Sequence, residues 1–343
     1  MFFYPLLKSL LFYFDAELAH RITINLLKTY QVKNSIEHQS LKSNIFGLNF
    51  PNPVGLAAGF DKNSEVPKNI INLGFGFSEV GTVTPLPQKG NSKPRVFRLK
   101  NNQAIINRLG FNNDGFEIVK KRLGKIGKNN IGVNIGANKN SEDFINDYLK
   151  GIEFFSSVAS YLTINISSPN TPGLRDLEAI ENFSLLLNGI DELKTKSTGI
   201  KLPILIKISP DINQDDLEIL CERVLSSSVD GLIISNTTIS RYSIDSSEEG
   251  GLSGQPIFES STSMLNKVYK YTEGKIPLIG VGGIDSAEKA YKKIKNGASL
   301  IQLYTGLVYK GPKLITEINK GLIKFIEKDG FNNISEAVGV EVN

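Results

Sequence analysis

The 343-residue sequence has no tryptophan, one cysteine and two histidines, and these scarcities exclude several kinds of site. A lone cysteine, Cys221, allows neither a disulfide framework nor a cysteine-based metal site. In its helical surroundings we expect it to be a small buried residue. His20 and His38 precede the first convincing core strand, so catalysis in the main body must proceed without histidine. The motifs HExxH, P-loop and GxGxxG after a strand are also missing, and we predict no bound metal.

The charges are nearly balanced. There are 39 basic and 35 acidic residues, a net charge of +4, and no basic cluster is interleaved with aromatic residues. This balance does not favour nucleic acid as a partner. Hydrophobic residues make up 40% of the chain and charged residues 22%, which is typical of a globular protein with a sizeable core.

The first thirty residues differ from the rest. Their opening apolar run is interrupted by Lys8 and closed by Asp15, well short of the ~20 residues that a membrane-spanning helix needs. They carry no signal-peptide or transit-peptide pattern. Such a segment can lie in a membrane interface or pack on the protein body, and both readings stay open at this point. Apolar residues recur at helical spacing at Phe3, Leu6, Leu7, Leu10, Phe14, Leu18, Ile22 and Leu26.

Eight strand-like runs follow, with helical patterns between most of them. Alternation of this kind predicts a (β/α)8 barrel in one domain; a doubly wound open sheet is the alternative. Two long inserts interrupt it. Residues 85–110 read as a hairpin over the barrel mouth, and residues 236–256 as a lid or a disordered tip. The predicted strands are 53–59, 77–84, 131–137, 161–167, 203–209, 231–237, 277–283 and 300–306.

Polar residues gather where these strands end, which is the face on which barrel enzymes place their chemistry. Lys207 is the sharpest signal, because it is flanked by isoleucines and a lysine is rarely buried without a partner. The neighbouring strands offer no carboxylate at the corresponding position, so we expect an anion that is not protein; a lysine reaching solvent is the alternative. Loops with glycines follow strands six, seven and eight. Singly they are ordinary turns, but together they indicate a phosphorylated cofactor across the mouth.

The chain resembles a known family in its longest motifs. GLAAGFDK, EVGTVTPLPQKGNSKPRVFRL, NRLGFNNDG, INISSPNTPGLR, SNTT, GGLSGQP, GVGGIDS and QLYTGLVYKGP are similar to those of the dihydroorotate dehydrogenases, and the resemblance spans nearly the whole chain. It implies an FMN-containing barrel that oxidises dihydroorotate to orotate in pyrimidine biosynthesis.

The resemblance is strongest to the class 2 enzymes, which are membrane-associated and use a quinone. The class 1 enzymes are expected to use a cysteine as base, whereas this loop offers Ser168. The resemblance further implies a helical extension over residues 1–44, which lies on the membrane and admits quinone past His20 and Arg21, and a catalytic barrel over residues 45–343. The expected location is the cytoplasmic face of the inner membrane, as a peripheral monomer.

Site residues follow from the resemblance position by position. Ser235 and Thr305 replace the usual threonine and serine, but both keep a hydroxyl. For FMN the implied set is Ala58, Gly59, Thr82, Asn134, Asn165, Lys207, Ser235, Gly254, Gly283, Tyr304 and Thr305. For the substrate it is Lys62, Asn107, Arg108, Leu109, Gly110, Phe111, Asn165, Asn170, Asn236 and Thr237.

Ser168 is the implied base for the proton on carbon 5, while the hydride on carbon 6 goes to the flavin. A serine must pass its proton onward, and the resemblance suggests a water near Thr171 and Phe111. The alternative is a structural role, in which the Ser168 side chain caps the turn. Asparagine amides suit the edge of orotate because they both donate and accept hydrogen bonds, and Lys62 suits its carboxylate or a ring carbonyl.

Three other functions stay open. The first is a class 1-like soluble enzyme that uses fumarate or NAD. The second is an FMN barrel acting on tRNA, such as a dihydrouridine synthase, although its expected cysteine and basic surface are missing. The third is a membrane-bound scaffold with an inactive barrel, which would take up no FMN.

Overall fold

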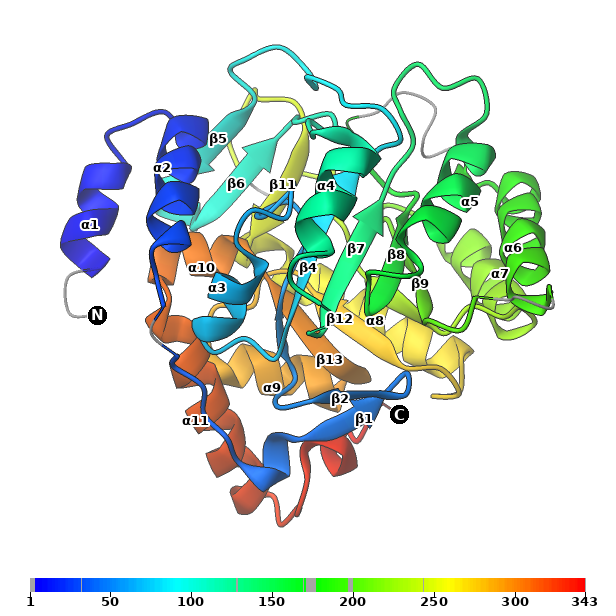
Figure 1. Cartoon of the computed structure of the whole chain (residues 1–343). Helices are drawn as coiled ribbons and strands as arrows, with labels where there is room; N and C mark the ends of the chain where they lie inside the picture. The colour runs from blue at the N-terminus through cyan, green and yellow to red at the C-terminus, as the bar shows by residue number, and fades with distance from the viewer. Residues whose placement is uncertain are drawn as a thin grey trace.

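The computed structural model describes residues 4–31, 33–127, 129–168, 170, 177–196, 200–242 and 244–342. Within these residues, eight parallel strands close into a barrel in the order in which they follow one another along the chain (Figure 1). All eight fall within the predicted runs or overlap them, so the (β/α)8 prediction is confirmed and the open sheet is excluded. The barrel strands are β3 (Val54–Leu56), β4 (Phe77–Val83), β7 (Ile131–Ile135), β8 (Tyr161–Asn165), β9 (Ile204–Ile208), β10 (Gly231–Ile234), β12 (Leu278–Val281) and β13 (Ala298–Leu303).

Helices surround the barrel and bury one apolar face each against it (Figure 1). Side-chain caps start several of them: Asn213 accepts a hydrogen bond from the Asp216 amide at the start of α7, and Ser286 from the Lys289 amide at the start of α9. Cys221 is fully buried on α7, as predicted. The helices are α3 (Pro67–Asn72), α4 (Gly115–Leu123), α5 (Phe144–Phe155), α6 (Ile180–Thr195), α7 (Gln214–Leu225), α8 (Phe258–Tyr271), α9 (Ala287–Lys295), α10 (Thr305–Lys310) and α11 (Lys313–Lys328).

The amino-terminal end of the barrel is closed by aromatic side chains. The hairpin of β1 (Ser43–Ile45) and β2 (Leu48–Phe50) lies below it (Figure 1), and Phe50 packs edge-on against Phe77 with ring centroids 5.3 Å apart. Glycine makes room for this layer. A Cβ at Gly132 would lie 2.1 Å from the Tyr161 ring, and one at Gly55 would lie 2.3 Å from the Phe77 ring. The barrel is therefore filled at this end, which leaves the carboxyl end for a site.

A small antiparallel sheet stands over the carboxyl end. It consists of β5 (Val96–Leu99), β6 (Ala104–Asn107) and β11 (Gly251–Gly254), with β6 in the middle. The predicted hairpin in the first insert is confirmed by the pairing of β5 with β6. The second insert, expected to be a lid or a disordered tip, supplies β11. Its sequence GLSG has low strand propensity, so pairing with β6 determines its conformation.

Two helices precede the barrel, α1 (Tyr4–Leu11) and α2 (Ala16–Lys28), and they lie beside β5 and α10 (Figure 1). Asp15 caps α2 by accepting hydrogen bonds from two amides of its first turn. The Tyr4 hydroxyl donates to the Val308 carbonyl at 2.8 Å, and Arg98 donates to the carbonyls of Leu11 and Phe14. Among the described helices, none is both long and apolar enough to cross a bilayer.

The outer face of these two helices is apolar. Leu6 is 71% exposed, and Leu10, Leu18 and Leu26 are also exposed. Tyr13, in the turn between the two helices, is 92% exposed. The prediction of amphipathic helices at this end is confirmed, although the turn at residues 12–15 divides the stripe into two helices. Packing on the body therefore accounts for only one face of them.

Candidate active site

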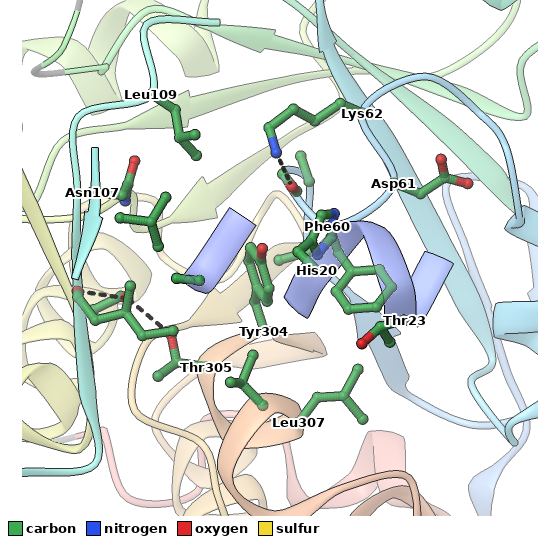
Figure 2. Close-up of a pocket in the computed structure, with 18 of the residues that line it drawn as sticks. His20, Thr23, Phe60, Asp61, Lys62, Asn107, Leu109, Tyr304, Thr305 and Leu307 are labelled. Atoms are coloured by element: carbon green, nitrogen blue, oxygen red, sulfur yellow. Dashed lines mark hydrogen bonds between the residues drawn. The ribbon is translucent and has the colours of Figure 1, made fainter. Parts of the chain in front are cut away.

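One cavity of about 1050 Å³ joins the carboxyl end of the barrel to the space beneath α1 and α2. This is at the upper end of the range for small-molecule pockets. At one end its wall is polar and comes from the strand ends; at the other it is mostly apolar and includes Leu7, Leu11, Leu18, Ile24, Leu27 and Leu307. Figure 2 shows His20, Phe60 and Tyr304 together near its middle, with Asn107 and Leu109 on the opposite side from Asp61. Two chemically different ligands could therefore occupy a continuous space.

Most residues predicted for the site line this cavity. Asn134 and Arg108 do not. Asn134 is fully buried behind the wall, and the Arg108 guanidinium turns away to pair with Glu248 at 2.8 Å. Thr171, expected beside the proton relay, lies outside the described residues. The predicted residues that line the cavity are Ala58, Gly59, Lys62, Thr82, Asn107, Leu109, Gly110, Phe111, Asn165, Ser168, Asn170, Lys207, Ser235, Asn236, Thr237, Gly254, Gly283, Tyr304 and Thr305, together with His20 and Arg21.

The strand-end amides form one hydrogen-bonded chain across the barrel mouth. The Thr82 hydroxyl donates to Asn134 Oδ1 at 2.6 Å, and Asn165 Nδ2 donates to the same oxygen at 3.2 Å. Asn236 Nδ2 in turn donates to Asn165 Oδ1 at 3.2 Å. The chain fixes which side of each amide is donor and which is acceptor. These side chains are therefore oriented before any ligand arrives.

A buried carboxylate lies at the base of this chain. Glu79, on β4, is fully buried and accepts from Asn134 Nδ2 at 2.7 Å. Its other oxygen accepts from the hydroxyls of Tyr161 and Thr163 at 3.2 and 3.0 Å and from Gln302 Nε2 at 2.9 Å. We did not predict Glu79. The signal was available, because Phe77 and Glu79 are two residues apart and so face the same side of the strand.

Glu79 revises the argument for Lys207. Burial lowers the pKa of the Lys207 ammonium, and the charge of Glu79 opposes that shift. The adjacent strands β8 and β10 offer no carboxylate, as expected. A closed barrel also brings distant strands to one interior, and so Glu79 adds a protein carboxylate that the sequence argument did not consider. Among the described residues, none forms a hydrogen bond or ion pair with its ammonium, which lines the cavity. An anionic group in the cavity remains a suitable partner.

Ser168 and Asn170 lie on the cavity wall after β8. Ser168 is only 5% exposed, and its Oγ accepts a hydrogen bond from the Asn170 amide at 3.3 Å. The Asn170 side chain reaches Asn107 Oδ1 at 3.5 Å. The hydroxyl of Ser168 is thus held inside the polar end of the cavity, next to two of the predicted substrate residues.

Lys62 and His20 mark the middle of the cavity. Lys62 Nζ donates to the Gly59 carbonyl at 2.8 Å (Figure 2). Burial lowers the pKa of Lys62 to about 8, and among charged groups Glu17 on α2 opposes this most. Burial likewise lowers the pKa of His20 to about 3, and its ring packs edge-on against Phe60 at 5.0 Å. His20 is therefore neutral, whereas Lys62 is available as a cation near neutral pH.

At two positions of the barrel mouth, glycine leaves room that a side chain would fill, because a Cβ there would clash with neighbouring residues. Gly254 has φ +103° and Gly283 has φ +73°; a Cβ would lie 2.4 Å from the Gln103 carbonyl in the first and 2.5 Å from Phe258 in the second. Thr305 begins α10 beside them, and its hydroxyl shares a hydrogen bond with Ser253 at 2.8 Å. Glycine backbone and hydroxyl groups on a cavity wall suit a phosphate.

Comparison with known proteins gives a consistent result. Residues 40–326 match the family described as Dihydroorotate dehydrogenase. The chain is 49% identical to Dihydroorotate dehydrogenase (quinone) of Parvibaculum lavamentivorans, covering 99% of both chains. It is 51% identical to the protein of the same name from Brucella ovis, covering 95% of this chain and 92% of that one. The crystal structure of ligand-free DHODH from Eimeria tenella superimposes with a TM-score of 0.89 at 38% identity, covering 95% of this chain and 99% of the other.

Proposed function

The chain belongs to the dihydroorotate dehydrogenase family, and from that premise we propose that it oxidises dihydroorotate to orotate with FMN as cofactor and a membrane quinone as final electron acceptor. The observation that carries the proposal is the single cavity, polar where the strands end and apolar beneath α1 and α2. A charged pyrimidine suits the first end and a quinone the second. This is the arrangement expected of the class 2 members of the family.

The cavity residues fit FMN. Gly254, Gly283 and Thr305 would hold its phosphate, and Lys207 would face the ring system with its positive charge. FMN, when bound, supplies the hydride acceptor. Ala58, Gly59, Thr82, Asn165, Ser235 and Tyr304 complete the proposed wall, and Asn134 supports it from behind through Thr82 and Asn165.

The substrate would lie between Ser168 and the cofactor. Lys62 offers a cation to the substrate carboxylate, and Asn107, Asn165, Asn170 and Asn236 offer donors and acceptors to the ring edge. Leu109, Gly110, Phe111 and Thr237 complete this part of the wall. Arg108 would act through the backbone alone, because its side chain is held by Glu248.

Ser168 is the proposed base. Oxidation removes a proton from carbon 5 and a hydride from carbon 6, and the Ser168 hydroxyl is the group that would accept the proton. Burial keeps bulk water away from it, so its own proton must leave through an ordered water. Phe111, which is only 9% exposed, would enclose that water.

The quinone would enter between α1 and α2. Residues 1–44 would form the extension and residues 45–343 the catalytic barrel, with His20 and Arg21 on the quinone path. The exposed leucines of α1 and α2 would sit in the bilayer interface. We place the protein on the cytoplasmic face of the inner membrane, as a peripheral monomer.

The test is anaerobic and has two steps. Dihydroorotate added to the purified yellow protein should bleach its visible absorbance, and a short-chain ubiquinone added next should restore it. Recovery with fumarate or NAD but not with quinone would favour the class 1-like alternative. Colourless protein that takes up no FMN would sink the proposal and favour the inactive scaffold.

A further inference from the structure

A partly buried ion pair joins the N-terminal helices to the barrel. Arg95 and Glu17 meet in a two-pronged contact, with Nε to Oε2 at 3.0 Å and Nη2 to Oε1 at 2.8 Å. The Arg95 side chain is 6% exposed and that of Glu17 19%. Paired, planar contacts of this kind have defined geometry and are stronger than exposed ion pairs. Such a pair fixes the first turn of α2 against the segment before β5.

The same guanidinium also holds a loop. Arg95 Nη1 donates to the carbonyls of Lys89 and Asn91 at 2.7 and 2.8 Å. One planar group therefore bonds simultaneously to α2 and to the turn at residues 89–91. Lysine could not reproduce this set, because it lacks the fixed fork of donors.

That turn reaches the polar end of the cavity. Asn91 Nδ2 donates to the carbonyls of Arg108 and Asn170 at 3.0 and 3.2 Å, and the Asn91 amide donates to the Leu109 carbonyl at 3.0 Å. Gln88 Nε2 donates to the Gly110 carbonyl at 3.0 Å. The loop of residues 85–95 therefore holds the backbone of the segments proposed to contact the substrate.

Glu17 also acts on the site through its charge. It lines the cavity, and it opposes the lowering of the pKa of Lys62 by burial, while Arg95 adds to that lowering. Lys93 is a second cation near Glu17, at 3.8 Å, but its side chain is 66% exposed. Arg95 is therefore the principal partner of Glu17.

We propose that Arg95 and Glu17 are positioning residues through which helix α2 holds the 85–95 loop in place, so that the N-terminal helices set the affinity of the substrate end of the cavity. The inference rests on the proposed function. It assigns to α2 a role in substrate binding besides its role beside the quinone.

The experiment measures orotate binding directly, by titration calorimetry on the purified FMN-loaded protein, so that turnover is not needed. Glu17→Gln and Arg95→Lys should each raise the orotate dissociation constant about tenfold. The double variant should bind orotate no more weakly than the weaker-binding single variant, because both changes break the same ion pair. The KM for a soluble quinone, at saturating dihydroorotate, should stay within about twofold.

Glu65→Gln is the matched control. It removes a different ion pair between α2 and the body, Lys28 Nζ to Glu65 Oε2 at 2.6 Å, at the opposite end of α2 from Glu17. Orotate binding should be unchanged in it. Hydrogen exchange gives a second readout, since amides of residues 85–95 and 107–111 should exchange faster in the Glu17 and Arg95 variants but not in the control.

The outcomes separate cleanly. Unchanged orotate affinity in Glu17→Gln and Arg95→Lys, or losses that multiply in the double variant, would overturn the proposal while leaving the function intact. An equal loss in Glu65→Gln would show that docking of α2 in general matters and not this pair. If the wild-type protein bound no orotate, that result would contradict both the proposed function and this inference. If Arg95→Lys does not fold, Glu17→Gln decides alone.

Discussion

Replacing Glu79 by glutamine tests the polar core of the barrel. The carboxylate accepts four hydrogen bonds, one at Oε1 from Asn134 and three at Oε2. A glutamine has one acceptor oxygen; if it serves the three donors, its amide nitrogen faces Asn134 Nδ2, a donor, at the former 2.7 Å contact. Asn134 cannot turn over to accept, because its oxygen already serves Thr82 and Asn165.

The cost can be worked out from these contacts. One hydrogen bond to a charged group is lost, which costs about 1.5–3 kcal/mol. Three other bonds change from charged to neutral, and each loses roughly 0.5–1 kcal/mol. Lys207 also loses the charge that opposes the burial shift of its pKa. The free energy of unfolding should fall by about 3–6 kcal/mol, which corresponds to a fall in Tm of roughly 4–8 °C for a chain of this length.

Thermal unfolding followed by circular dichroism, with FMN in excess, measures this. Ser78→Ala is the control, since Ser78 is the adjacent residue on the same strand, is equally buried and has no hydrogen-bond partner for its hydroxyl among the described residues. Its Tm should stay within about 2 °C of wild type. A similarly small change in Glu79→Gln would refute the reasoning that the Glu79 carboxylate organises the barrel mouth.

Three further predictions follow from the geometry. Lys62, with a pKa of about 8, is charged below that pH and neutral above it, so orotate affinity should fall by up to about tenfold per pH unit above pH 8. Lys62→Met should make orotate affinity independent of pH in this range. A pH dependence that persists in Lys62→Met would contradict the assignment of Lys62 to the substrate carboxylate. In a denaturant titration, Gly132→Ala should lower the free energy of unfolding by about 1–3 kcal/mol, because the new Cβ would overlap the Tyr161 ring. Gly124→Ala, whose Cβ would have its nearest contact at 3.4 Å, should leave it unchanged. Changing Leu6 and Leu10 together to glutamine, which removes apolar surface without adding charge, should reduce co-sedimentation with phosphatidylglycerol vesicles. Leu185→Gln, at an exposed leucine on α6, should not. Equal binding by wild type and both variants would argue against α1 as the membrane contact.

The barrel could be predicted because its signals are local. Each strand carries its own apolar run and is followed by a helical pattern, so the order of elements suffices to predict closure. The carboxyl ends then meet on one face, which brings Asn165, Lys207 and Asn236 together without knowledge of any contact.

What the sequence did not reveal depends on contacts between distant segments. Glu79 and Lys207 lie on strands that are far apart in the chain and share an interior only after closure. The strand β11 exists because β6 supplies its partner, since GLSG alone has no strand pattern. Arg95 and Glu17 are 78 residues apart, and either looks like an ordinary surface charge until α2 packs beside β5.

Single-turnover reduction of the cofactor by dihydroorotate in Ser168→Ala tests the central claim most directly, namely that this hydroxyl takes the substrate proton. In anaerobic rapid mixing, the rate constant for bleaching should fall by about 10²–10⁴-fold, while the orotate dissociation constant stays within a few-fold of wild type. Ser167→Ala, the neighbouring buried serine that bonds to Asn165 and Asn236, should lose far less. A rate constant in Ser168→Ala within about twofold of wild type would contradict the account.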